Sequence, residues 1–416
     1  MSVLTSTPAP AGSRHVDAQP SYLAEYVLFP FYDWLVLFYP KSWWPNTLTA
    51  FGVSCTLLAS LLLLASMPLN AAFDPPKAVL PPISWVLPAG APTPPVTPLH
   101  PTRIEPVVGG RDHLFLFYSV CAILYLTYCV ADNTDGRLAR RDRKTSVIGE
   151  YLDHGLDCVT SLLSACVAFC VMGCTMCNMS ISVCMVAFVT ILSHTLHYEL
   201  NTFVWGTRLA TVDEAMIFFG VCLWIALACP FLATDRPLSL TLLQGLPLIG
   251  TYCPTTLLNL ASLLTYNEWI YIFYNITQFS TILGVAARRW SMLLRLPTLF
   301  VAVNTAVLLS LLPSHSALAA AHPPVSRTAV TTTQFGPFQY PAVWMITAAS
   351  TFSVIVHVVI MAKCAHFKAP DFLPLAGLVF VWFAFVSCPV GGMLLAVLLH
   401  VVQVKWNVGF LRQKKQ

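Results

Sequence analysis

The stretch Asp132–Asp157, which reads DNTDGRLARRDRKTSVIGEYLDHGLD, decides how this chain is organised. The chain has 22 basic and 18 acidic residues, and 11 of these 40 charges fall within the 26 residues of the stretch. The chain as a whole is 57% hydrophobic, as apolar as a lipid-embedded protein. Because a charge next to hydrocarbon is costly, a cluster of charges in such a chain indicates a functional site.

The apolar runs predict an all-α polytopic membrane protein with about ten transmembrane helices. The runs are 48–67, 114–131, 156–176, 181–198, 212–233, 267–286, 294–313, 341–362, 370–388 and 390–406. With ten crossings, most Lys and Arg clusters fall on one side, which the positive-inside rule assigns to the cytosol. The formal net charge of +4 is small and scattered, so nucleic acid is not expected as a partner.

Four aspartates in the charged stretch are spaced for two helices. They are Asp132, Asp135, Asp153 and Asp157. The first two are three residues apart and the last two are four apart, so each pair shares one helical face. Small residues on both predicted helices let the two backbones approach each other; these are Gly136, Ala139 and Gly149. We therefore expect the four carboxylates to converge.

Converging carboxylates repel one another unless cations lie between them. All-oxygen ligands favour hard ions, so the predicted cofactor is Mg²⁺ or Mn²⁺. Two such ions commonly promote in-line displacement at phosphorus. Arg140 and Lys144 can neutralise a phosphate, Arg with a bidentate fork.

The motif D-x2-D-G-x2-A-R-x8-G-x3-D-x3-D resembles the signature of the CDP-alcohol phosphotransferases, which are membrane enzymes of phospholipid synthesis. The segment GEYLDHGLD, with His154 between the last two aspartates, resembles the eukaryotic choline/ethanolamine phosphotransferases in particular. Eight fixed positions make this a specific match. A charged loop between membrane helices is the simpler alternative.

The resemblance implies a reaction. Phosphoethanolamine or phosphocholine passes from CDP-ethanolamine or CDP-choline to diacylglycerol, or to an alkyl-acylglycerol, as the last step of the Kennedy pathway. The products are phosphatidylethanolamine or phosphatidylcholine and CMP. The resemblance also implies a homodimer in the membrane of the endoplasmic reticulum, or of the Golgi, with its active site facing the cytosol. Two alternatives stay open: a relative that uses another CDP-alcohol, and an ion-coupled carrier, although the sequence shows no repeated halves.

The resemblance also assigns roles to residues. The four aspartates hold the metal ions, and Arg140 and Lys144 contact the phosphates. The substrate-binding set further includes Asn46, Gly136, Ala139 and Gly149. His154 titrates near neutrality and suits the role of general base, with Asp157 as the alternative. Glu199 lies in HYELNTFVWGTRLATVDEA, which also resembles this family, and is a candidate contact of the amino alcohol; a solvated interfacial position is the simpler interpretation.

The chain divides into five predicted regions. Residues 1–20 form a disordered tail, and 21–45 form an interfacial amphipathic segment broken at Pro30. The catalytic core covers 46–235 and includes a lumenal insert, 68–112, which holds 12 of the 31 prolines. Further transmembrane helices occupy 236–406, and a basic cytosolic tail occupies 407–416.

Overall fold

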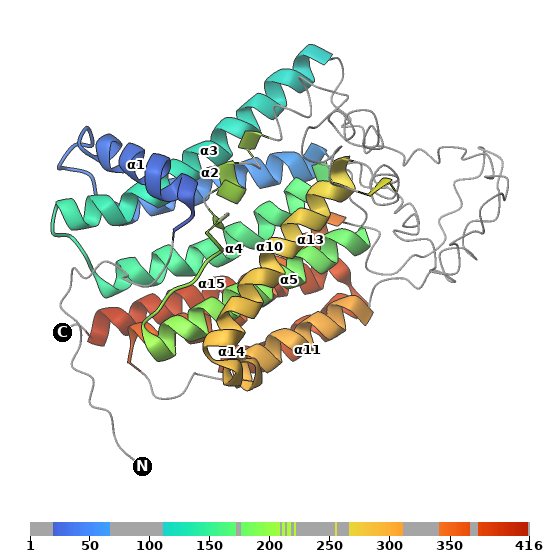
Figure 1. Ribbon diagram of the computed structural model, residues 1–416. Helices are drawn as coiled ribbons and strands as arrows, with labels where there is room; N and C mark the ends of the chain where they lie inside the picture. The colour runs from blue at the N-terminus through green and yellow to red at the C-terminus, as the bar shows by residue number, and fades with distance from the viewer. Residues whose placement is uncertain are drawn as a thin grey trace.

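A computed structural model describes residues 20–66, 111–171, 176–208, 210–212, 214–217, 220–221, 254–255, 266–310, 341–366 and 373–414. This part of the chain is helical and contains no β-strand (Figure 1). Residues 1–19 of the predicted disordered tail, 68–110 of the proline-rich insert and most of the predicted helix 212–233 lie outside the described residues. The last two residues of the predicted insert, 111–112, begin a helix.

The described residues form helices along most of their length. In chain order they are η1 (Ala24–Leu28), α1 (Phe29–Val36), α2 (Pro45–Ser66), α3 (Arg111–Arg141), α4 (Val147–Val171), α5 (Met176–Leu200), α10 (Tyr266–Arg288), η3 (Trp290–Leu294), α11 (Leu296–Ser310), α13 (Pro341–Cys364), α14 (Leu373–Ser387) and α15 (Pro389–Lys414). Nine of the ten predicted transmembrane runs coincide with helices among the described residues. Five of these helices, α2, α3, α5, α13 and α15, are long and apolar enough to cross a membrane. The predicted all-α membrane architecture is confirmed.

The segment before α2 differs from its prediction at Pro30. The π-helical turn η1 runs directly into α1, so the helix continues through this residue. Proline lacks an N–H and clashes with the preceding turn of a regular α-helix. A π-helical turn is wider and has a different hydrogen-bond spacing, so it accommodates the proline without a break.

The close approach that we predicted between α3 and α4 is replaced by contacts with α2. Figure 1 shows α3 and α4 diverging from their short connection, and α2 packs extensively against both. A methyl group on Gly52 of α2 would lie 2.7 Å from Cβ of Ala131 on α3. Gly149 of α4 instead faces Asn46 of α2, whose Oδ1 would lie 3.0 Å from a methyl group there. The small residues thus let a third helix approach.

Helix α4 occupies the centre of the bundle. It packs against α2 on one side and against α5 and α13 on the other. Helix α13 is almost wholly enclosed and also contacts α11, α14 and α15. Its fully buried side chains include Trp344 and Phe352. The helix that carries two of the four aspartates is therefore held from several sides.

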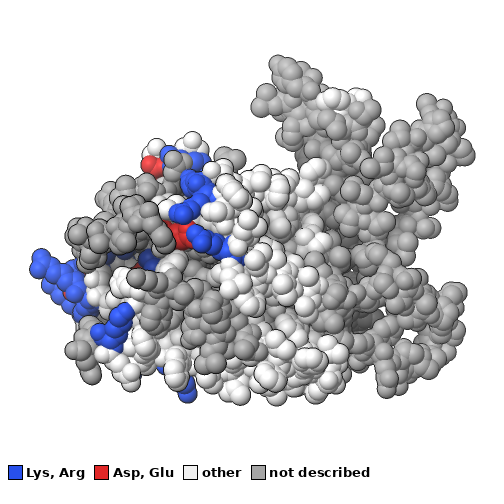
Figure 2. Space-filling view, turned by 90° about the horizontal axis from the view of Figure 1, so that it is seen from below, with Lys and Arg blue, Asp and Glu red and all other residues white. Residues whose placement is uncertain are grey.

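In the described part of the chain, charge is concentrated at one end of the bundle. Figure 2 shows Lys and Arg gathered in one half of the visible face, toward the end at which α3 meets α4 in Figure 1. The described basic residues there include Arg140 and Arg143 near the end of α3 and Arg412 near the end of α15. The charged stretch therefore lies at the basic end of the bundle.

Candidate active site

Three of the four predicted aspartates come together. A carboxylate oxygen from each of Asp132, Asp153 and Asp157 lies within 4.8 Å of the others. Asp132 comes from α3, and the other two come from successive turns of α4. These three carboxylates therefore converge as the spacing in the sequence predicts, even though α2 separates α3 from α4 along much of their length.

Asp135 turns toward α2. Its Oδ2 accepts a hydrogen bond from Thr49, whose hydroxyl oxygen also lies 3.2 Å from the carbonyl oxygen of Pro45. Asp135 is buried, so this hydroxyl partly offsets the cost of its desolvation. Sequence reasoning missed Thr49, although it lies three residues after Asn46 in the stretch PNTLT, 45–49.

A tyrosine orients the last aspartate. Tyr128 of α3 donates a hydrogen bond to Oδ1 of Asp157 at 2.8 Å, and Thr160 of α4 donates to the tyrosine oxygen at 2.9 Å. Such outer partners hold a potential metal ligand in one rotamer. The aspartate spacing alone gave no signal for Tyr128, because that residue lies one turn before the motif.

Arg140 lies close to the aspartates and is available for an anion. A methyl group on Gly136 would lie 3.4 Å from one guanidinium nitrogen, so the side chain folds back along α3 over this glycine. Within the described part of the chain, no carboxylate oxygen lies within 4.0 Å of it as an ion pair. Ala139, the neighbouring small residue of the motif, is partly buried.

Lys144 is placed differently from Arg140. Its Nζ donates to the carbonyls of Lys41 at 2.7 Å and Trp43 at 2.9 Å, and it lies 3.5 Å from Asp142. It therefore fastens the connection before α2 to the loop after α3. Two hydrogen bonds from Arg141 hold the pKa of the Asp142 carboxyl below its usual range. The proposed phosphate contact of Lys144 stays a prediction.

His154 packs against side chains of α5 and of the segment that follows it. Its ring lies 5.5 Å from that of His194, 5.7 Å from His197 and 5.2 Å from Phe203, between centroids. Ligand atoms of Glu150, His154 and His197 also lie within 4.8 Å of one another. The predicted base thus belongs to a histidine cluster beside the aspartate site.

Glu199 lies at the end of α5. It forms ion pairs with Arg289 at 3.2 Å and Arg295 at 2.7 Å, and these tie α5 to the connection between α10 and α11. Its side chain is 13% exposed. The contact with an amino alcohol stays a prediction, and the structure gives this residue a packing role in addition.

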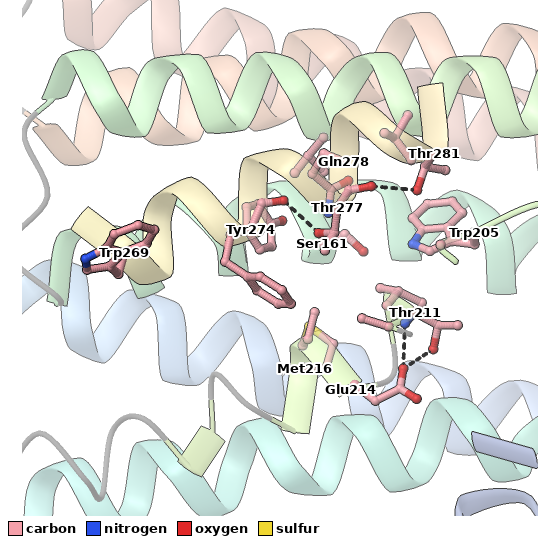
Figure 3. A pocket seen from close by; sticks show the side chains of 17 residues that line it. Ser161, Trp205, Thr211, Glu214, Met216, Trp269, Tyr274, Thr277, Gln278 and Thr281 are labelled. Atoms are coloured by element: carbon pink, nitrogen blue, oxygen red, sulfur yellow. Dashed lines mark hydrogen bonds between the residues drawn. The ribbon is translucent and has the colours of Figure 1, made fainter. Parts of the chain in front are cut away.

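An apolar cavity of about 500 Å³ adjoins the site (Figure 3). Its walls come from α4, α5, α10 and the segment 205–216. Ser161 of α4 borders it one turn beyond Asp157, and Trp205 borders it from the loop after α5. The ring of Trp205 lies 5.8 Å from that of His194, so the cavity reaches the histidine cluster. Sequence reasoning did not predict this cavity, because its residues are scattered over four segments.

The aspartate cluster fits the predicted cofactor. Three carboxylates that approach to within 4.8 Å offer only oxygen ligands, which suit a hard divalent cation such as Mg²⁺ or Mn²⁺. The nearby histidines belong to the other cluster, around His154.

Comparison with known families gives this geometry a context. Residues 115–242 match the family model of the CDP-alcohol phosphatidyltransferases. This segment is a CDP-alcohol phosphatidyltransferase domain. It includes the aspartates, His154, Glu199 and one face of the cavity, whereas α10 to α15 lie beyond the matched residues.

Three relatives resemble the domain. Choline/ethanolaminephosphotransferase 2 of Arabidopsis thaliana is 32% identical over 137 residues, which cover 33% of this chain and 25% of the relative. Choline/ethanolaminephosphotransferase 1 of the same plant is 28% identical over 145 residues, 35% of this chain and 27% of the relative. An uncharacterised CDP-alcohol phosphatidyltransferase class-I family protein of Dictyostelium discoideum is 25% identical over 150 residues, 36% of this chain and 29% of the relative. The matches thus span less than a third of the relatives, and the plant proteins support the eukaryotic branch.

Proposed function

We propose that this protein transfers phosphoethanolamine or phosphocholine from its CDP derivative to diacylglycerol or an alkyl-acylglycerol, and releases CMP. The observation that carries the proposal is the layout of α4. This helix presents Asp153 and Asp157 to the aspartate cluster, and one turn later Ser161 borders the apolar cavity. One helix can thus hold a charged donor next to an apolar acceptor.

The donor binds at the aspartate cluster. When bound, Mg²⁺ or Mn²⁺ supplies positive charge to the diphosphate and lowers the cost of the charge that develops on transfer. Arg140, which lies close by and carries no ion pair among the described residues, contacts the phosphates. Asn46 and the motif residues Gly136, Ala139 and Gly149 border the space for the cytidine.

The acceptor binds from the cavity side. Its hydroxyl oxygen forms a bond to the phosphorus that bears the amino alcohol, while the bond from that phosphorus to the CMP oxygen breaks. His154 takes the hydroxyl proton as general base. Its position supports this role, because the rings of His194 and Trp205 connect it to the cavity wall. Asp157 is the alternative base.

The proposal also covers the location and orientation of the protein in the cell. We place the protein in the endoplasmic reticulum, or the Golgi, with the aspartate cluster facing the cytosol. The basic end of the bundle supports this orientation through the positive-inside rule (Figure 2). A homodimer is the proposed assembly.

The test uses the purified chain in nanodiscs that contain diacylglycerol and Mg²⁺ or Mn²⁺. Radiolabelled CDP-ethanolamine and CDP-choline are supplied separately, and labelled phospholipid is measured. Product from one donor supports the proposal and assigns the head group, and product from both assigns a dual specificity. A protein that binds metal yet makes no product from either donor overturns the amino-alcohol assignment, and other CDP-alcohols then become the substrates to try.

A further inference from the structure

A buried chain of hydrogen bonds lies behind the active-site helix. Nδ2 of Asn407 on α15 donates to the hydroxyl of Tyr151 on α4 at 2.9 Å. The same hydroxyl lies 2.9 Å from Nδ1 of His357 on α13. All three side chains are buried, so the chain of bonds joins α4 to two helices that lie outside the matched domain.

The direction of these bonds follows from the groups involved. An amide nitrogen can only donate, so the tyrosine oxygen accepts from Asn407. This oxygen can also accept a second hydrogen bond or donate its own hydrogen, so the tautomer of His357 sets the direction of its bond with Nδ1. Either direction holds the imidazole of His357 at the tyrosine hydroxyl. Its ring packs at 5.0 Å, between centroids, against that of His400 on α15. Each member of the chain therefore has a defined orientation.

Gly155 lets the imidazole reach the backbone of α4. A methyl group on this glycine would lie 2.5 Å from Cε1 and 3.0 Å from Nδ1 of His357. Both distances are too short for a side chain, so any larger residue would push the ring away. The glycine that follows His154 in the motif is thus explained by contact with α13.

The geometry of a helix connects these contacts to the aspartates. Tyr151 and Gly155 each precede an aspartate by two residues, which is about 200° around an α-helix. One face of α4 therefore rests on His357 while the opposite face presents Asp153 and Asp157. A small rotation of α4 would move both carboxylates away from Asp132.

We propose that Tyr151, His357 and Asn407 are positioning residues that fix the rotation of α4 and so complete the metal site. The C-terminal helices α13 and α15 would thereby take part in the activity without contacting the substrate. This inference rests on the metal site of the proposed function, and its test reads metal binding directly.

The first test compares Tyr151→Phe with Tyr125→Phe by titrating each purified protein with Mn²⁺ and following the ion by electron paramagnetic resonance. Tyr125 is a matched control, because its buried hydroxyl bonds to that of Ser60 on α2, at 2.9 Å, rather than to His357 or Asn407. We expect Tyr151→Phe to weaken Mn²⁺ binding up to about 10-fold, no more than the loss of a group bonded directly to a metal ligand, because Tyr151 acts through the rotation of α4. Tyr125→Phe should bind as the wild type does. Equal affinities in all three proteins would overturn the proposal.

A second comparison uses the contact between Gly155 and His357. Gly155→Ala should weaken Mn²⁺ binding, and adding His357→Ala should bring no further loss, because the clash disappears with the ring. Losses that add would contradict the proposed contact. His357→Asn, which retains a hydrogen-bonding group, should bind Mn²⁺ more tightly than His357→Leu. If the wild type binds Mn²⁺ but makes no phospholipid, the proposed reaction fails while these comparisons still decide the positioning role.

Discussion

His154 and Asp153 are neighbours in the chain, but their side chains lie in different surroundings. Asp153 approaches Asp132 and Asp157, whereas His154 packs among His194, His197 and Phe203. The helix turns by about 100° per residue, which is enough to separate the two roles. Metal binding and proton transfer can therefore be tested by separate substitutions.

We predict that His154→Asn lowers kcat by about 10²- to 10⁴-fold, the usual contribution of a general base. Mn²⁺ binding should stay close to that of the wild type, because the histidine is not in the aspartate cluster. Both quantities can be measured on the same preparation in nanodiscs. Wild-type turnover in His154→Asn would contradict this role and favour Asp157.

At the scale of the helices, α2 acts as the spacer between α3 and α4. Gly52 makes this possible, because a methyl group there would lie 2.7 Å from Cβ of Ala131 and 3.5 Å from Cα of Tyr128. Tyr128 in turn orients Asp157. The packing of α2 on α3 is therefore coupled to the geometry of the site.

We expect Gly52→Ala to destabilise the protein by roughly 1–3 kcal/mol, as overpacking of a core usually does. Gly409→Ala on α15 is the matched control, because a methyl group there meets nothing within 4 Å. Since alanine is intrinsically the better helix former, the control should be neutral or stabilising by up to about 1 kcal/mol. Thermal unfolding in detergent measures both, and similar melting temperatures for the two variants would argue against the close packing.

Helix α1 is fastened to α3 by arginines. Arg137 forms a 2.8 Å ion pair with Asp33, and Arg141 donates to the carbonyls of Val36 and Tyr39. The outward face of the helix carries exposed aromatic side chains, consistent with the predicted interfacial position.

Arg141→Ala should loosen α1, because the carbonyls of Val36 and Tyr39 lose their charged donor. Hydrogen exchange of the amides in 24–36 should become faster by about 10-fold, which corresponds to a loss of roughly 1.4 kcal/mol in the local opening free energy. Arg143→Ala provides the control, because this arginine is exposed and forms no ion pair among the described residues. Unchanged exchange in Arg141→Ala would show that other contacts hold α1.

At the scale of the whole molecule, the sequence predicted the helices and the aspartates better than it predicted their packing. Spacing along one helix is a local property, so Asp153 and Asp157 lie together as expected. The interposition of α2 and the turn of Asp135 toward Thr49 depend on three helices at once. No pattern within the motif contains that information.

The apolar helices show why the packing between them could not be predicted from the sequence. In a soluble protein, an amphipathic pattern reveals which face of a helix is buried. Here lipid and protein interior are both apolar, so the pattern is lost. Trp344 of α13 is fully buried and Phe383 of α14 is 71% exposed, yet both lie in similar apolar runs. The contact of His357 with Gly155 and the apolar cavity were unpredictable for the same reason.

The most direct test of the account is the dependence of phospholipid formation on Mg²⁺ in wild type, Asp153→Asn and Asp142→Asn. Asp142 is the matched control, because it pairs with Arg141 and Lys144 outside the cluster. We predict that chelation abolishes product formation, that Mg²⁺ restores it in wild type and Asp142→Asn, and that Asp153→Asn stays more than about 100-fold slower. Metal-independent product, or equal rates in the two variants, would contradict a metal site at the aspartates as the centre of the proposed reaction.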